Sequence, residues 1–72
     1  MFVVHGLPHD PTDHDRVIGW AVFRPAPWHL VGVFATEYMA RKELQTRGDD
    51  YHVQLGSYKL GSQDFKAFTF EL

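Results

Sequence analysis

Three histidines and three aspartates lie within residues 5–15, HGLPHDPTDHD, and both residue types bind metal ions. A zinc or nickel site needs such ligands to converge at about 2.0–2.2 Å on a fixed scaffold. A helix would be a suitable scaffold for histidines with the spacing H-x3-H-x4-H, but Pro8 and Pro11 exclude a helix here. The candidate ligands are His5, His9, His14 and Asp13.

The same stretch has a simpler interpretation as a connection between strands. Asp10 precedes Pro11, and aspartates at such positions stabilise turns by bonding to nearby backbone N–H groups. No established metallohydrolase motif is present. We therefore favour a loop without a cofactor, and keep a histidine- and aspartate-based site for a metal or small ligand as the alternative function.

The residues needed for catalysis are sparse. The chain has no cysteine, and its two serines, Ser57 and Ser62, follow glycines in turn-like contexts. Asp49 and Asp50 are adjacent in sequence and are typical of a solvated turn. Because a ligand pocket of about 300 Å³ would consume much of so small a core, we predict that the protein is not an enzyme.

Composition limits the class of protein and its partners. Seventy-two residues support one core, so residues 1–72 form a single domain. The net charge of −2 makes nucleic acid an improbable partner, although Arg41, Lys42 and Arg47 lie close together. The sequence lacks a signal-peptide pattern, and no apolar run approaches the roughly 18 residues of a membrane span. We expect no membrane association and a cytoplasmic location.

Hydrophobic periodicity predicts an α+β fold. The pattern favours a single small antiparallel sheet of four to five strands, with one helix packed on one face. The expected order is strand, strand, strand, helix and strand, with an optional last strand. The strands are expected at residues 2–5, 16–23, 29–34, 51–60 and 66–72, and the helix at 37–47. Residues 30–60 are similar in pattern to a strand-helix-strand unit of many small bacterial and phage proteins, which implies no activity.

The second and third strands should form a hairpin. Residues 16–23 are apolar on both alternating faces, as in a central strand covered on both sides. Pro25 and Pro27 should end this strand by Arg24. In a symmetric hairpin, Gly32 would lie opposite or diagonal to Trp20, whose ring could cover it.

Individual residues mark the ends of the helix and one irregularity. Thr36 suits the N-cap, and Gly48 suits the left-handed position after the helix. In the following strand, Gly56 suggests a bulge, after which Tyr58 and Leu60 would face inward.

Recognition of another protein is the function that these observations favour. Trp28 lies in a proline-flanked loop, where it is either an exposed binding anchor or a lid on the core. A strand face uncovered by the helix could instead be covered by a second copy, giving a homodimer. The predicted interface residues are Trp28, Trp20, Phe23, Arg24, His29 and Tyr58.

The sequence therefore predicts a small non-enzymatic protein-binding module that regulates or inhibits a larger partner by occupying its surface. Short phage-encoded inhibitors of host or defence machinery, such as anti-CRISPR proteins, are one class of this kind. The sequence carries no motif that assigns the chain to that class.

Overall fold

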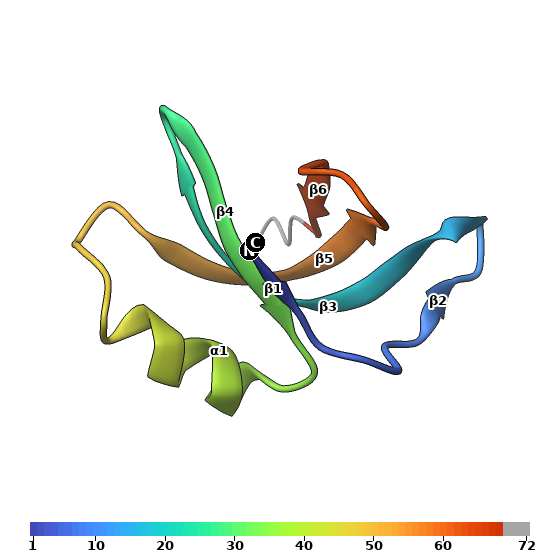
Figure 1. Cartoon of the computed structure of the whole chain (residues 1–72), viewed down its shortest axis with the longest axis horizontal. Coiled ribbons are helices and arrows are strands. Elements are labelled where there is room, and N and C mark those ends of the chain that lie inside the picture. Colours follow the sequence, from blue (N-terminus) through green and yellow to red (C-terminus); the bar gives the residue numbers. More distant parts are fainter. Residues whose placement is uncertain (69–72) are drawn as a thin grey trace.

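The sheet is built around β3, a thirteen-residue strand that pairs with three others. The computed structural model describes residues 1–68, with one helix and a six-stranded mixed sheet of order β1-β4-β3-β5-β6 (Figure 1). β2 pairs with β3 outside this path. The elements are β1 (Phe2–Val3), β2 (His9–Asp10), β3 (Asp13–Pro25), β4 (Trp28–Phe34), α1 (Glu37–Leu44), β5 (His52–Lys59) and β6 (Phe65–Ala67).

The predicted α+β class with a single helix is confirmed, but the sheet differs in two respects. It has six strands instead of four to five, and β1 pairs in parallel with β4 while the other pairs are antiparallel. β2 is only two residues long and lies in the Pro- and Asp-rich stretch, so no periodic pattern marks it. The last predicted strand begins one residue earlier, as β6, and its positions 69–72 lie outside the described residues.

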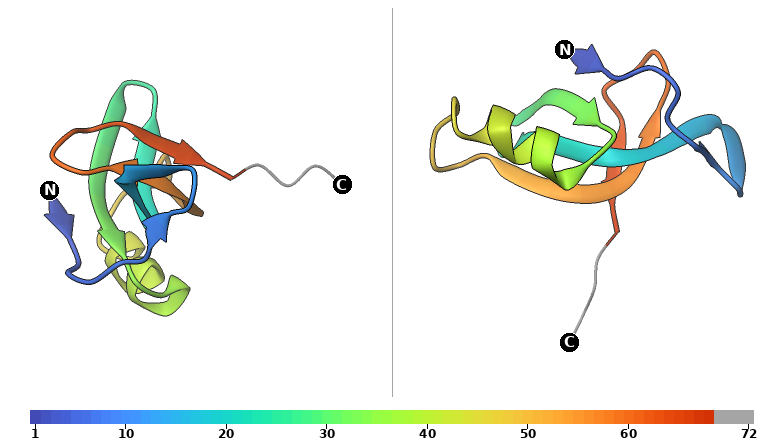
Figure 2. Two further views of the ribbon diagram at one scale, coloured as in Figure 1. Left: turned by 90° about the vertical axis from the view of Figure 1, so that its right-hand side faces the viewer. Right: turned by 90° about the horizontal axis from the view of Figure 1, so that it is seen from below.

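Each face of the sheet buries its own apolar cluster. α1 packs on one face near one end of the sheet, with the β2–β3 turn at the other end (Figure 2). Side chains from the N-terminal segment and β6 contribute to the cluster on the opposite face. The helix-side cluster consists of Val22, Val31, Phe34 and Ala40, and the opposite cluster of Leu7, Val17, Ala21, Phe23, Leu30, Val33, Tyr58 and Phe65. The prediction of a central strand covered on both sides is confirmed.

The helix begins as predicted and ends early. Thr36 is the N-cap, and its side chain accepts a hydrogen bond from the Met39 N–H at 3.2 Å. After Gln45, the N–H groups of Thr46 and Arg47 bond three residues back, which tightens the last turn. A left-handed residue is not needed there, so the prediction for Gly48 was wrong; the positive-φ glycines within residues 1–68 are Gly6 and Gly61.

The β3–β4 hairpin has a two-residue loop, Ala26–Pro27, joined by a cis peptide bond. β3 extends to Pro25, one residue beyond its predicted end, and Pro25 pairs with Trp28. The diagonal relation of Gly32 to Trp20 is confirmed, because Trp20 pairs with Phe34 and Val22 pairs with Gly32. A Cβ atom at Gly32 would lie 2.7 Å from the Phe2 carbonyl oxygen, so glycine here allows β1 to approach.

The sequence suggested that the Trp20 ring covers Gly32, but this prediction was wrong. The ring beside Gly32 is that of Phe34. Two Phe34 ring carbons would lie 3.2 Å from a Cβ atom at this position. Phe34 is two residues further along the same strand, on the helix side of the sheet.

The predicted bulge at Gly56 was wrong, because the β3–β5 ladder runs without a shift from Arg16–Lys59 to Phe23–His52. Tyr58 is buried as expected, but in the cluster opposite α1, and Leu60 is exposed. Gly56 serves a different purpose. It pairs with Ala67, and a Cβ atom would lie 2.8 Å from the Ala67 Cα and closer still to the Lys66 carbonyl and the Phe65 ring.

Replacing Gly56 with alanine should lower the free energy of unfolding by about 1–3 kcal/mol, because β6 and the Phe65 ring must move away. Urea denaturation would measure this change. Gly48→Ala is the matched control: its Cβ atom meets only the Asp50 carboxylate at 3.2 Å, and the change should stay within about 0.5 kcal/mol. Equal stability of the two variants would contradict the packing described for β6.

Candidate functional site

Three of the predicted interface residues gather at one place, the end of the β3–β4 hairpin. We call residues 24–29 the hairpin tip; it includes Arg24, Trp28 and His29. β5 pairs with β3 only as far as Phe23–His52, so the tip projects beyond β5 (Figure 1). Phe23 adjoins the hairpin tip, and the other two predicted residues lie elsewhere. Phe23 is buried beneath Trp28, Trp20 packs against the helix-side cluster, and Tyr58 is buried further along the sheet.

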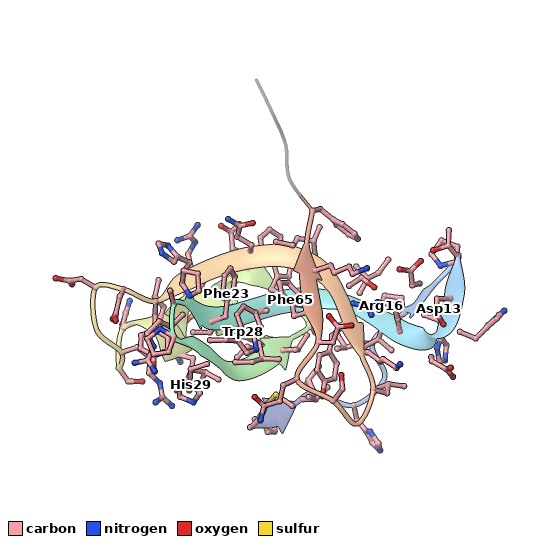
Figure 3. All side chains as sticks on the ribbon, turned by 90° about the horizontal axis from the view of Figure 1, so that it is seen from above. Asp13, Arg16, Phe23, Trp28, His29 and Phe65 are labelled. Atoms are coloured by element: carbon pink, nitrogen blue, oxygen red, sulfur yellow. The ribbon has the colours of Figure 1, made fainter. Side chains whose placement is uncertain are left out.

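Trp28 combines the two roles that the sequence left open. Its indole packs on the Phe23 ring with centroids 5.5 Å apart, and its Nε1–H donates to the Gln63 carbonyl at 3.0 Å (Figure 3). Phe23 also contacts Phe65 and His52, at 5.7 and 6.1 Å between centroids. Trp28 nevertheless remains 41% exposed. The ring is therefore held in place on one side and open to solvent on another.

The other face of the hairpin tip carries a polar aromatic group. The Arg24 guanidinium lies 5.3 Å from the centroid of the Tyr51 ring, and its Nε–H donates to the Pro27 carbonyl at 3.0 Å. The Tyr51 hydroxyl is hydrogen-bonded to Nδ1 of His29 at 2.6 Å. Sequence reasoning missed Tyr51 as a site residue, because only the β3–β5 register brings it beside the hairpin.

The HGLPHDPTDHD stretch forms part of a β2–β3 hairpin, where it was expected to be a plain loop. The expected aspartate turns are present: Asp10 Oδ1 accepts from Thr12 N–H at 2.9 Å, and Asp13 Oδ1 accepts from Asp15 N–H at 3.0 Å. His9 Nδ1 is hydrogen-bonded to the backbone carbonyl of His14 at 3.1 Å. Among residues 1–68, no three histidine or carboxylate side chains converge on a point that could hold a metal ion.

A buried polar network at the far end of β3 was not predicted. Arg16 donates from Nε to Ser57 Oγ at 2.8 Å, from Nη2 to the Ser57 carbonyl at 2.7 Å, and from Nη1 to Asp64 Oδ2 at 3.0 Å. The Ser57 hydroxyl donates in turn to Asp10 Oδ2 at 2.8 Å. The network thus joins β2, β3, β5 and the segment before β6. The Ser57 hydroxyl is committed to these structural bonds.

Hydrogen bonds to the Asp10 carboxylate lower its pKa below the ordinary value of 3.8. The backbone N–H of Thr12 contributes most, followed by the hydroxyls of Thr12 and Ser57, and the Arg16 charge adds to them. These donors all favour the ionised form. The bonds by which Asp10 ties the β2–β3 turn to the network are therefore strongest while Asp10 is charged.

Comparison with known proteins adds no functional information. No protein-family model matches the chain, and neither the curated proteins nor the solved structures contain a match. Within residues 1–68, α1 is too short and too polar to cross a membrane.

Replacing Arg16 with methionine should lower the free energy of unfolding by about 1–3 kcal/mol, because it removes three hydrogen bonds in a mostly buried environment. Thermal or urea denaturation would measure this. Arg41→Met is the control: among residues 1–68 the side chain of this exposed arginine pairs with Glu37 on the same helix, and surface pairs contribute about 0–1 kcal/mol. A loss no greater than that of the control would show that the network is not structural.

The Asp10→Asn variant should be less stable than wild type at neutral pH, and the gap should close in acid. A carboxylate with a lowered pKa stabilises the folded state above the unfolded-state pKa, and this contribution is lost as the pH falls through the lower folded-state pKa. Urea denaturation from pH 7 to pH values below 3.8 would follow the gap. A gap that stays constant across this range would contradict the assignment to the Asp10 charge.

Proposed function

We propose that this chain is a small non-enzymatic protein-binding module, a regulator or inhibitor that covers a surface of a larger protein. The observation that carries the proposal is the half-exposed Trp28, fixed by the Phe23 ring and the Gln63 carbonyl at the projecting hairpin tip. Large aromatic anchors contribute most of the binding energy in many protein interfaces.

Pre-organisation strengthens this argument. Binding is weakened when side chains must lose rotamer freedom on contact, at a cost of about 0.5–1.5 kcal/mol for each flexible group. The Trp28 ring already has its Nε1–H and one face occupied by the protein's own groups. The remaining exposed surface is available to a partner without further ordering of the loop.

The proposal includes a cytoplasmic setting, where a chain without cysteine needs no oxidising environment to fold. A homodimer is the other form of protein binding considered from the sequence. The Arg24 charge at the hairpin tip supports a different protein as the partner.

Affinity purification of the tagged protein from the lysate of its own source tests the proposal. Wild type should retain one protein at constant stoichiometry. Trp28→Ala should weaken the isolated complex by about 2 kcal/mol or more, which is roughly a 30-fold rise in Kd. Because Trp28→Ala also removes a packing contact, His29→Ala serves as a second variant. Its side chain is exposed, and it should weaken the same complex.

Tyr38→Ala is the matched control, since Tyr38 is a 71% exposed aromatic residue on α1, away from the hairpin tip. It should leave the complex unchanged. Circular dichroism of all variants would establish that they fold. Retention of the partner by both folded hairpin-tip variants, or loss by Tyr38→Ala alone, would place the interface elsewhere, and the absence of any stoichiometric partner would contradict the proposal.

A further inference from the structure

The outer edge of β4 is only partly covered by the chain's own strands. β1 pairs with Gly32 and Val33 alone, and the Val4 N–H extends this contact by donating to the Val33 carbonyl at 3.0 Å. On the same side of residues 28–31, the described part of the chain places no strand. The hairpin tip therefore ends in a short free strand edge.

Backbone groups on this edge are open to a new strand. In a hairpin with a two-residue loop, the flanking residues Pro25 and Trp28 face each other across the turn. The alternation of the antiparallel ladder then directs the N–H and C=O groups of His29 outward. Unpaired groups of this kind are a template on which an extended chain can add as a further strand.

The side chains beside this edge define what an added strand would carry. Successive side chains of a strand point to opposite faces, so one residue would lie beside Trp28 and the next beside His29. The Trp28 side is apolar. The His29 side holds the Arg24 guanidinium, and neither residue forms an ion pair with a carboxylate among residues 1–68, Asp49 and Asp50 included.

A hollow continues the His29 side of β4. It has a volume of about 530 Å³ and lies between the N-terminal segment, β4 and α1. Its wall is part apolar and part polar, and the polar part holds the Glu43–Arg47 ion pair. The residues that line it are Met1, Phe2, Val31, Phe34, Glu43 and Arg47. A strand alongside residues 28–31 would turn its next side chain on this face toward the hollow.

We propose that the free edge of β4 binds an extended segment of the partner protein as an added β-strand. Three partner residues are read: an acidic side chain at Arg24 and His29, an adjacent apolar side chain at Trp28, and an apolar side chain two positions from the acidic residue on its other side, at the hollow beside Val31. This inference rests on the proposed function and specifies the chemistry of the partner.

Charge argues for a partner protein over a second copy of this chain. Two copies joined edge to edge about a two-fold axis would bring the Arg24 guanidinium of one copy toward that of the other and would supply no carboxylate to either. Like charges placed opposite each other across strands are destabilising. An acidic residue in the partner segment supplies the complementary charge.

Selection of decapeptides from a random phage-displayed library against the immobilised full chain tests this inference. The enriched peptides should share an acidic residue with an apolar residue next to it on one side and a second apolar residue two positions away on the other side. Binding of a selected peptide should weaken about tenfold with Arg24→Gln, a change of about 1.4 kcal/mol. Arg41→Gln, a change at an exposed arginine on α1, is the control and should leave Kd unchanged. Hydrogen exchange of the His29 amide should slow in the complex.

Several results would overturn the inference. These are an enriched motif with helical spacing, equal affinity for Arg24→Gln and wild type, an unprotected His29 amide in the complex, the absence of any enriched peptide, or a dimer of the chain formed through residues 28–31. Each of them leaves the proposed function standing if a partner from the lysate still depends on Trp28 and His29. Loss of that dependence would contradict the proposed function instead.

Discussion

Burial of both faces of β3 is the constraint on which the rest of the structure depends. The single eight-residue helix covers one face around Val22. The opposite face must be covered by side chains from the two ends of the described chain, with Leu7 on one side and Phe65 on the other. β6 packs closely on Gly56 for this reason. The connection before β6 then reaches the hairpin, where the Gln63 carbonyl accepts from Trp28.

The hairpin tip is a consequence of the unequal lengths of the strands. β3 is thirteen residues long, whereas β5 is eight residues long and leaves β3 after Phe23. Beyond that point β4 is the one strand of the described chain that accompanies β3, so the outer edge and both faces of the tip are less covered than those of the remaining sheet. Hydrogen bonds and stacking hold the tip side chains where neighbouring strands do not. A rigid, partly exposed aromatic surface is the result.

Local signals predicted the elements well, and long-range contacts account for what was missed. Thr36 and the apolar periodicity located the helix and the three longest strands. β2 and the parallel β1–β4 pair depend on tertiary packing. Strands of two residues are too short to show a periodic hydrophobic pattern that would predict this pairing. Gly56 was interpreted as a bulge because a single sequence does not distinguish a glycine that marks a bulge from one that lets a neighbouring strand approach closely. Tyr51 and the Arg16 network were missed because their partners lie 22 or more residues away.

The claim that Trp28 is held in place at the hairpin tip while remaining exposed is tested most directly by hydrogen exchange at its indole N–H, followed by NMR. The hydrogen bond to the Gln63 carbonyl predicts exchange at least about tenfold slower than in a free tryptophan, corresponding to about 1.4 kcal/mol of protection. A fluorescence quencher in solution should still reach the 41% exposed ring. Exchange at the rate of free tryptophan would contradict the account, because the ring would then lack its fixed position.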